Sequence, residues 1–486
     1  MKLTDLIKNI KVKEIINENN IEISGISYNS KTIQKGEMFV CLVGEHTDGH
    51  NFAKMAVENG ASALFCEKQI DDIQVPQIIV ESTRKQIAEL SSSFYNNPSK
   101  NFQLIGVTGT NGKTTVTHLI QRIVEKANKE CALIGTLGHK FTSKDTYHDA
   151  KHTTPQAPEL QKTFETICKK NIKYVAMEVS SHALEQNRVG CCDFNGAVYT
   201  NLTQDHLDYH ITMNNYFEAK SILFKNLKPN GFAIINNDDE YAEKFKSVIP
   251  ENVKILTYGI KNNADIMAKN IDFSINGACF ECKINNETKK VSLQMNGMFS
   301  VYNALAALTT GIAMDFDKDI CIQALEETKS VDGRFEIVCK KPLVIVDYAH
   351  TPDGLENVLR AAREITPKES NLICMFGCGG DRDATKRPKM GSIAEENADI
   401  VVVTSDNPRS EDPQLIISDI LAGIKSVNTK NVFVEADRGV AISMLKNIAK
   451  ENDVVVLAGK GHEDYQILKN ETIHFDDREE AKKVFG

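Results

Sequence analysis

Hydrophobic positions along the chain fall into short runs that alternate with amphipathic stretches, a pattern typical of α/β units. In the first hundred residues the apolar runs have the length of strands, and helical patterns lie between them. These runs cover residues 21–26, 38–43, 63–66 and 77–80. We therefore expect a small N-terminal α/β domain over residues 1–101.

The pattern changes near residue 102, where a strand, a glycine-rich loop and a helical pattern at residues 116–124 follow one another. Further strands are predicted at residues 174–177, 196–200 and 232–236. After residue 331, strands alternate regularly with amphipathic helices, which predicts a mainly parallel sheet covered on both faces. These strands cover residues 343–346, 372–376, 400–403, 432–435 and 454–457. We expect a central domain over residues 102–330 and a C-terminal domain over residues 331–486.

Length and composition agree with this division. A chain of 486 residues corresponds to about three domains, and 41% hydrophobic with 25% charged residues is typical of globular proteins. The net charge of −9 argues against broad binding of nucleic acid or anionic membranes. No apolar run approaches the roughly 20 residues of a membrane span, and the N-terminus lacks a secretory signal pattern. Twelve scattered cysteines favour reduced thiols, so we expect a cytoplasmic protein.

The strongest chemical signal is the glycine-rich loop at residues 104–115, which joins a predicted strand to a predicted helix. Gly109 and Gly112 allow backbone N–H groups to surround phosphate oxygens, and Lys113 adds a positive charge. The Thr114 hydroxyl can bind Mg²⁺ at the start of the helix. The strict phosphate-loop spacing is not met, because Val107 stands where the first glycine should be. The loop, which also contains Thr110, Asn111 and Thr115, predicts binding of ATP or GTP.

Two further polar segments follow predicted strands. Glu178 comes directly after the strand at 174–177, and His206 lies a few residues beyond the strand at 196–200. Ligands of open α/β sheets collect at such strand ends, so both side chains are candidates for a second metal ion beside the triphosphate. Taken alone, each residue is more often a helix cap or a surface residue than a metal ligand. Lys220 on the next helical stretch would by default be a solvated helix lysine.

Seven motifs taken together, in this order and over the whole chain, resemble the Mur ligase family. They are residues 109–115 (Gly-Thr-Asn-Gly-Lys-Thr-Thr), 178–182 (Glu-Val-Ser-Ser-His), 201–210 (Asn-Leu-Thr-Gln-Asp-His-Leu-Asp-Tyr-His), 347–352 (Asp-Tyr-Ala-His-Thr-Pro), 379–383 (Gly-Gly-Asp-Arg-Asp), 406–409 (Asp-Asn-Pro-Arg) and 459–464 (Gly-Lys-Gly-His-Glu-Asp). One departure is His152, where many relatives carry Asn. The resemblance implies a uridine-binding N-terminal domain, a central P-loop ATPase-like domain and a C-terminal Rossmann-like domain.

The resemblance also implies a reaction in which ATP converts a carboxylate into an acyl phosphate that an amine then attacks. Catalytic roles would belong to Lys113, Glu178, His206 and Lys220. Thr114 would bind one Mg²⁺ and Glu178 with His206 another, assisted by Lys220 as a carbamate (N6-carboxylysine). Lys220 needs a shielded, neutral amine for this modification. Further ATP contacts would be made by Asn303, Arg334 and Asp347.

The carboxylate substrate implied by the resemblance is UDP-MurNAc-L-Ala-D-Glu, bound between the first two domains. Arg188 has the clearest physical case, because a guanidinium offers a forked set of donors to a carboxylate or diphosphate. Ser30 is equally compatible with an ordinary turn. The implied contacts are Ser30, Glu45, His46, Thr47, His152, Thr153, Thr154, Ser180, Gln186 and Arg188.

Within the family, the motif at residues 406–409 resembles enzymes that take meso-diaminopimelate rather than L-lysine as the amine. Diaminopimelate carries a second carboxylate that Arg409 could bind in bidentate fashion, and leaving Arg409 unpaired against lysine would cost binding. Asp406 and Glu463 could accept from the ammonium groups. The implied pocket consists of Arg382, Asp406, Asn407, Pro408, Arg409, Gly459 and Glu463.

Alternative interpretations remain at this point. A folylpolyglutamate synthetase shares the ligase core but needs neither the uridine domain nor the 406–409 motif. A P-loop switch or transport ATPase would hydrolyse ATP without an acceptor, and a structural protein is a third possibility. Cys279 and Cys282 have metal or redox spacing, but their surroundings indicate a β-hairpin. We expect the chain to act as a monomer.

Overall fold

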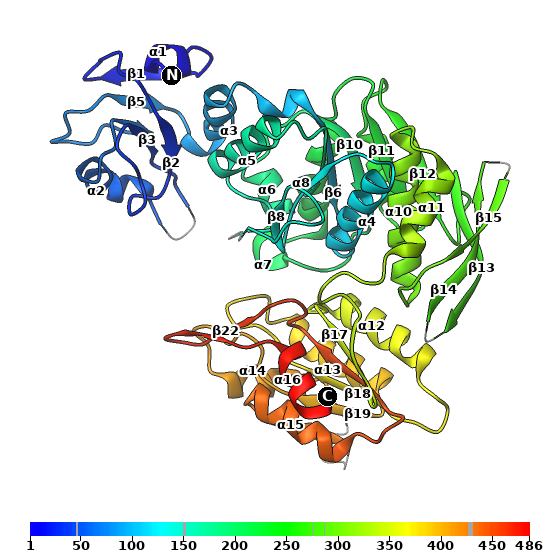
Figure 1. The fold of residues 1–486 in the computed structure, drawn as a ribbon. Coiled ribbons are helices and arrows are strands. Elements are labelled where there is room, and N and C mark those ends of the chain that lie inside the picture. Colours follow the sequence, from blue (N-terminus) through cyan, green and yellow to red (C-terminus); the bar gives the residue numbers. More distant parts are fainter. Residues whose placement is uncertain (45–46, 149–151, 275, 286, 426–430) are drawn as a thin grey trace.

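Three large β-sheets form the framework of the molecule, each built from a different stretch of the chain, and a small sheet of two strands lies near the C-terminus (Figure 1). The computed structural model describes residues 1–44, 47–148, 152–274, 276–285, 287–425 and 431–486. The N-terminal lobe lies beside the central lobe, and the C-terminal lobe lies against another side of the central lobe (Figure 1). No described helix is long and apolar enough to cross a membrane.

The N-terminal sheet has the strand order β1-β5-β4-β3-β2 and is parallel except for β1, which runs antiparallel to β5. Helices α2 and α3 accompany it. The elements of this lobe are α1 (Leu3–Leu6), β1 (Val12–Ile16), β2 (Gly25–Ser27), β3 (Glu37–Val40), α2 (Ala53–Glu58), β4 (Ala63–Cys66), β5 (Gln77–Val80) and α3 (Thr83–Phe94).

Ten strands form the central sheet, in the order β15-β14-β13-β12-β11-β10-β6-β9-β7-β8. The strands from β13 to β7 are parallel, and antiparallel strands complete both edges. The strands are β6 (Gln103–Thr108), β7 (Cys131–Gly135), β8 (Gly138–Lys140), β9 (Tyr174–Glu178), β10 (Phe194–Tyr199), β11 (Phe232–Asn236), β12 (Lys254–Gly259), β13 (Ile266–Ser274), β14 (Gly277–Ile284) and β15 (Glu287–Ser292).

Helices cover both faces of the central sheet because the side chains of its strands alternate between two apolar cores. In β6, Ile105 and Val107 pack with α4 and α10, whereas Leu104 packs with α5 and α8 on the other face. The carboxyl ends of the parallel strands therefore open onto loops between helices, where α/β proteins bind ligands. The helices are α4 (Lys113–Lys126), α5 (Ala157–Lys169), α6 (Ser181–Glu185), α7 (Leu207–His210), α8 (Met213–Lys225), α9 (Ala242–Ser247), α10 (Met298–Ala313) and α11 (Lys318–Glu327).

The C-terminal sheet has the order β16-β17-β21-β18-β19-β20, and all neighbours are parallel except β16 and β17. Val454 and Val456 of β21 pack into one core and Val455 and Leu457 into another, so the predicted two-sided coverage is confirmed. The elements are β16 (Glu336–Lys340), β17 (Leu343–Asp347), α12 (Pro352–Ile365), β18 (Leu372–Phe376), α13 (Lys386–Asn397), β19 (Ile400–Val403), α14 (Pro413–Leu421), β20 (Val432–Val434), α15 (Arg438–Ile448), β21 (Val454–Ala458), β22 (Tyr465–Ile467), β23 (Thr472–His474) and α16 (Asp477–Phe485).

The predicted strands match the structure best where they are buried on both faces. Predictions at 63–66, 77–80, 232–236, 372–376 and 400–403 coincide with β4, β5, β11, β18 and β19. The strand predicted at 38–43 ends earlier, because the Leu42 N–H donates to the Val40 carbonyl and turns the chain. The predicted hairpin around Cys279 and Cys282 is confirmed, and all twelve cysteines have free thiols.

Candidate active site

The glycine-rich loop joins β6 to α4 and is shaped by two glycines in the left-handed region. Gly109 has a φ of +150° and Gly112 a φ of +87°, which other residues adopt with strain. A Cβ on Gly109 would overlap the Thr200 hydroxyl, and one on Gly112 would lie 2.5 Å from Oδ1 of Asn303. Asn303, on α10, therefore lies directly against the loop. The loop has no room for larger residues at these two positions.

Lys113 begins α4 and lies at the centre of a charged cluster. Its Nζ donates to the carbonyl oxygens of Gly109, at 2.9 Å, and Thr110, at 2.8 Å. Burial lowers the pKa of Lys113, while the carboxylates of Glu178 and Asp205 raise it and Arg334 lowers it further. The side chains of two predicted site residues, Glu178 and Arg334, thus lie close to the Lys113 ammonium.

Lys220 lies on α8 and is buried, with 1% of its surface exposed. Its Nζ donates to the Gly109 carbonyl at 2.9 Å, so it contacts the same loop as Lys113. Burial and the nearby charge of Lys113 hold the pKa of Lys220 well below its usual range, against the effect of Asp205. The default expectation of a solvated lysine is wrong here. The amine is shielded from solvent, and its lowered pKa favours the neutral form.

Glu178, at the end of β9, is buried and held from one side. One carboxylate oxygen accepts the Thr136 N–H at 2.9 Å and the other accepts the Thr136 hydroxyl at 3.0 Å. His206 precedes α7, and its Nε2 lies 3.3 Å from a carboxylate oxygen of Asp205. Burial lowers the pKa of His206 to about 3, so its imidazole is neutral and able to bind a metal.

The residues present fit a magnesium ion that is bound partly by phosphate. Among the described residues, no group of three or more His, Cys, Asp or Glu side chains gathers as a metal cage. Mg²⁺ usually takes one or two protein carboxylates and completes its octahedron with phosphate oxygens and water. Thr114, whose hydroxyl accepts from Arg334 Nη2 at 3.1 Å, and Glu178 are suited to that role.

Among the described residues, two hydrogen bonds join the C-terminal lobe to the phosphate loop and the start of α4. One is the Arg334–Thr114 contact, and the other joins Asn111 Nδ2 to a carboxylate oxygen of Asp353 at 2.8 Å. The Arg334 guanidinium also lies 4.7 Å from the Tyr348 ring centre. Asp347 accepts the backbone N–H groups of Phe335 and Ala349, so its side chain shapes this junction.

Four of the residues expected to bind the muramyl peptide form one hydrogen-bonded group. Arg188 donates to Oε1 of Gln186, from Nη2 at 2.7 Å, and to the Thr154 carbonyl at 2.9 Å. The Thr154 hydroxyl contacts the Ser180 hydroxyl at 3.5 Å and accepts the Ser180 N–H at 3.1 Å. The Tyr28 hydroxyl of the N-terminal lobe reaches α5 close by, donating to Glu159 at 2.8 Å.

The other expected substrate contacts are more scattered. Thr153 lies beside Thr136, with 3.1 Å between the two hydroxyl oxygens, which places it next to Glu178. Ser30 is buried in the N-terminal lobe, with its hydroxyl 3.6 Å from the Met55 sulfur. Thr47 and His152 are exposed. Glu45 and His46 lie outside the described residues.

The residues expected to bind the amino acid gather at the carboxyl ends of β18, β19 and β21. Asn407 Nδ2 donates to Glu463 at 2.9 Å, and Arg409 Nη1 donates to the Gly380 carbonyl at 2.7 Å. Burial and the charge of Asp406 raise the pKa of Glu463, while Lys460 opposes this effect. A Cβ on Gly459 would lie 2.5 Å from an Asp406 carboxylate oxygen.

Other members of this pocket differ in exposure. Arg382 is exposed and donates to the Asp381 carbonyl at 3.0 Å, and Pro408 is buried beside Arg409.

Two further residues expected to contact ATP are buried. Thr110 lies in the phosphate loop and Thr115 at the start of α4.

A cavity of about 520 Å³ lies between the central and C-terminal lobes, beside Glu463. Its lining comes from Thr136, Leu137, Tyr147, Asp332, His462, Glu463, Asp464, Tyr465 and Arg478. Thr136 also donates to Glu178, so Glu178 lies directly behind one wall of this cavity. It is large enough for a small substrate.

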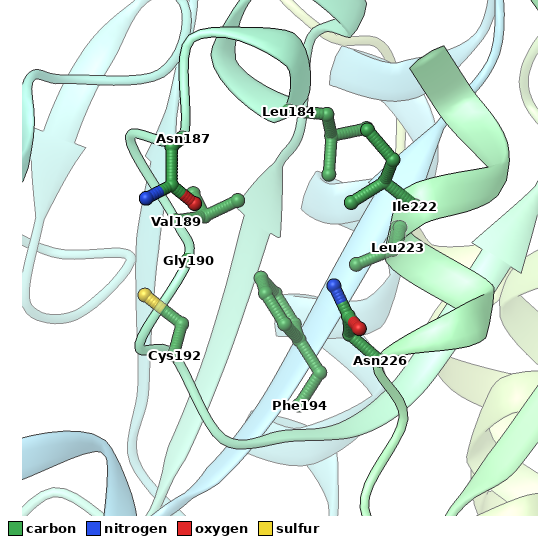
Figure 2. Close-up of a pocket in the computed structure, with 9 residues that line it drawn as sticks. All are labelled: Leu184, Asn187, Val189, Gly190, Cys192, Phe194, Ile222, Leu223 and Asn226. Atoms are coloured by element: carbon green, nitrogen blue, oxygen red, sulfur yellow. The ribbon is translucent and has the colours of Figure 1, made fainter. Parts of the chain in front are cut away.

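A second cavity, in the central lobe, does not bind a substrate. Figure 2 shows Leu184, Val189, Phe194 and Ile222 around it, between α6, α8 and the segment before β10. Its volume is about 20 Å³, room for about one water molecule. It is too small for any substrate.

Sequence reasoning did not assign a role to Asp205 or Thr136. Asp205 lies inside the 201–210 motif, so a search for carboxylates near Lys113 could have found it. Thr136 follows β7 and carries no sequence signal, because its contact with Glu178 depends on two strands pairing. Tyr348, which stacks on Arg334, lies inside the 347–352 motif.

Ile211, between α7 and α8, has a backbone conformation that favours glycine. Its φ is +68°, the Thr212 N–H donates to the His210 carbonyl across it, and 75% of its surface is exposed. A β-branched residue in such a turn is strained, at a cost of about 1–3 kcal/mol. Ile211→Gly should therefore raise the thermal unfolding midpoint by about 2 °C, measured by calorimetry. Val440→Gly, in the exposed part of α15, should lower it, and an Ile211→Gly protein that melts no higher than wild type would refute the strain.

Comparisons with known proteins identify the family of the chain. Three family models match consecutive segments: "Mur ligase family, catalytic domain" at residues 22–95, "Mur ligase middle domain" at 107–311 and "Mur ligase, glutamate ligase domain" at 333–461. A "UDP-N-acetylmuramoyl-L-alanyl-D-glutamate--2,6-diaminopimelate ligase" from Clostridium botulinum is 45% identical, over 100% of this chain and 99% of the relative. Its counterpart from Bacillus velezensis is 46% identical over the same shares.

A solved structure described by the same enzyme name covers 100% of this chain and 99% of its own, with 33% identity and a TM-score of 0.68. The three-lobed arrangement is therefore the Mur ligase architecture. On the family models and the full-length relatives together, the chain belongs to the Mur ligase family.

Proposed function

We propose that the protein is an ATP-dependent ligase that joins meso-diaminopimelate to the D-glutamate carboxylate of UDP-MurNAc-L-Ala-D-Glu. The observation that carries this proposal is the contact of the phosphate loop region with the C-terminal lobe, where Arg334 Nη2 donates to the Thr114 hydroxyl. The Arg188 cluster lies in the central lobe and the Arg409 pocket in the C-terminal lobe, so the two lobes that meet at this contact carry the groups expected for the two substrates. The full-length relatives carry names that describe the same reaction.

Each lobe has a distinct proposed role. Residues 1–101 would bind the uridine end of the nucleotide, residues 102–330 ATP, and residues 331–486 the amino acid. The phosphate loop would surround the triphosphate with backbone N–H groups, while Lys113 and Arg334 would balance its charge. Asn303 would contact the nucleotide from α10. Mg²⁺ bound by Thr114, Glu178 and His206 would stabilise negative charge that develops on the phosphates.

The proposed intermediate is an acyl phosphate, which can be tested with an isotope. We expect substrate labelled with ¹⁸O in the reacting D-glutamate carboxylate to transfer one labelled oxygen to each inorganic phosphate released, read by mass spectrometry. The label moves because the carboxylate oxygen attacks the γ-phosphorus and stays with it when the amine displaces phosphate. Unlabelled phosphate, with tripeptide formed, would contradict the intermediate.

We further propose that Lys220 is carbamylated. A carbamate forms when the lone pair of a neutral amine attacks the carbon of carbon dioxide and the nitrogen loses a proton, and the lowered pKa of Lys220 favours that neutral amine. Carbamylation would convert the Lys220 amine, which lies near Lys113, into an anion. That negative charge would offset the positive charge of Lys113 and help to bind Mg²⁺. The buried position also protects the modification from water.

Lys220→Ala should lower kcat by about 10²-fold or more, because the anion is lost from the phosphate cluster. Added short-chain carboxylic acids should restore part of the rate by entering the vacated space, measured as tripeptide formation. Lys225→Ala, on the same helix with an exposed ion pair to Glu218, should leave the rate unchanged. A Lys220→Ala enzyme with the wild-type rate would rule the carbamate out.

Selection of meso-diaminopimelate is proposed to depend on Arg409 and Glu463. The Arg409 backbone is fixed by a hydrogen bond from its N–H to the Ile467 carbonyl at 3.1 Å, and Nη1 is fixed by Gly380. The remaining guanidinium donors would meet the distal carboxylate. Glu463, held by Asn407, would accept from an ammonium group.

The twelve free thiols support a reducing compartment, and we propose that the enzyme acts in the cytoplasm. Action as a monomer stays a prediction.

A further inference from the structure

Lys386 is a buried lysine to which the reaction outlined above gives no role. It is the first residue of α13, in the C-terminal lobe, and 8% of its surface is exposed. Within the described part of the chain, no carboxylate lies within ion-pair distance of its ammonium, and the ammonium donates no hydrogen bond. The stem of the side chain is covered while the ammonium nitrogen keeps some exposure, so a ligand can reach it.

The backbone at this position is firmly held. The next residue, Arg387, is buried and forms ion pairs to Glu411 and Asp419, each at 2.9 Å. These contacts attach the start of α13 to the C-terminal lobe. The backbone of Lys386, the preceding residue, is therefore fixed in position.

The direction of Lys386 follows from its neighbour one turn later. Residues three apart lie on the same face of a helix, so Lys386 and Lys389 share a face of α13. Lys389 Nζ donates to Oε1 of Gln204 in the central lobe at 2.6 Å. This face of α13 is therefore turned toward the segment that contains Asp205 and His206.

The segment that Lys389 contacts is itself bonded to the phosphate loop. Thr203, the residue before Gln204, donates its N–H to the Thr110 hydroxyl at 3.0 Å, and that hydroxyl donates to the Thr203 carbonyl at 3.1 Å. The face of α13 that carries Lys386 and Lys389 is therefore turned toward the segment that holds the phosphate loop.

We propose that Lys386 is a further catalytic residue, whose ammonium contacts the γ-phosphoryl group as it is transferred from ATP to the substrate carboxylate. The proposal rests on the ligase reaction proposed above. In that step a carboxylate oxygen bonds to the γ-phosphorus while the bond from phosphorus to the β,γ-bridging oxygen breaks. ADP leaves with that electron pair, and the three other γ-oxygens stay on phosphorus, where Lys386 can donate to them.

This assignment gives the C-terminal lobe a part in the first chemical step as well as in binding the amino acid. Lys113 reaches the phosphates from the loop side, and Lys386 would reach them from the opposite lobe. Charge on the transferred group is stabilised best by donors that are already fixed in place. The Arg387 anchors provide that fixation.

The test compares Lys386→Ala, Lys386→Arg and the control Lys389→Ala. ADP formation from ATP and UDP-MurNAc-L-Ala-D-Glu, without amino acid, is followed in a single turnover at saturating ATP. We expect Lys386→Ala to lower this rate by about 10²-fold while the Kd for ATP changes less than tenfold. Lys386→Arg should retain more activity, and Lys389→Ala, which loses only the contact to Gln204, should stay within about threefold of wild type.

The outcomes separate this inference from the overall function. A wild-type rate for Lys386→Ala, or an equal loss in Lys389→Ala, would overturn the role of Lys386. A rate loss explained entirely by weaker ATP binding would also overturn it. Thermal unfolding of each variant shows whether the C-terminal lobe is intact. If Lys386→Ala is unstable, the rate of ADP formation by Lys386→Arg is compared with that of wild type instead, and an unchanged rate would overturn the role of the Lys386 ammonium. If wild type makes no tripeptide, the proposed function fails, whatever the Lys386 variants do.

Discussion

Replacing Lys113 with methionine should lower kcat/KM for ATP-dependent ligation by about 10³-fold, which corresponds to about 4 kcal/mol. Lys113 Nζ now donates to two carbonyls of the loop that would surround the phosphates, and it lies among Glu178, Asp205 and Arg334. Methionine keeps the length of the side chain but removes the charge. The loss should appear in phosphate release at saturating dipeptide and amino acid.

The matched control is Lys126→Met, at the other end of α4. Lys126 forms an exposed ion pair with Glu327 at 2.8 Å, and such pairs contribute little. It should unfold and react like wild type. A Lys113→Met enzyme that ligates at more than a tenth of the wild-type rate would show that the loop does not hold the triphosphate as proposed.

The second large effect is expected at Arg409. Arg409→Ala should lower kcat/KM for meso-diaminopimelate by about 10²-fold or more, because a charge-assisted, forked contact to the distal carboxylate is lost. Turnover of L-lysine, which lacks that carboxylate, should change less than fivefold. The comparison is made by tripeptide formation with each amino acid over a range of concentrations.

Arg360→Ala provides the control, since Arg360 lies on the surface of α12 and pairs with Glu356, four residues earlier. It should leave both amino acids unaffected. An equal loss for both amino acids in Arg409→Ala would mean that Arg409 stabilises the pocket without reading the distal carboxylate.

The sequence predicts the parallel sheet of the C-terminal lobe well because its strands are buried on both faces. In the central lobe it predicts β9, β10 and β11, but β7, which is buried along its whole length, and β12 were not predicted. Continuous apolar runs such as 400–403 and 454–457 leave little choice of structure. The N-terminal strand β1 was missed because its positions are half-exposed and no strict alternation marks them. Its place depends on antiparallel pairing with β5, a contact more than sixty residues away.

The candidate site divides in the same way. The phosphate loop is local, so glycine positions and Lys113 follow from spacing alone. The burial of Lys220 does not, because it depends on α8 packing under the loop. Lys386 is also invisible in the sequence, since only the contact of α13 with Gln204 turns it toward Asp205. Such convergence is a property of tertiary structure.

The most direct test of the account measures phosphate release that depends on ATP and UDP-MurNAc-L-Ala-D-Glu. Three reactions run in parallel, with meso-diaminopimelate, with L-lysine and with no amino acid, and mass spectrometry identifies the product. The account predicts release and tripeptide with meso-diaminopimelate and little of either in the other two reactions. Equal release in all three would contradict a ligase, and preference for L-lysine would contradict the role of Arg409.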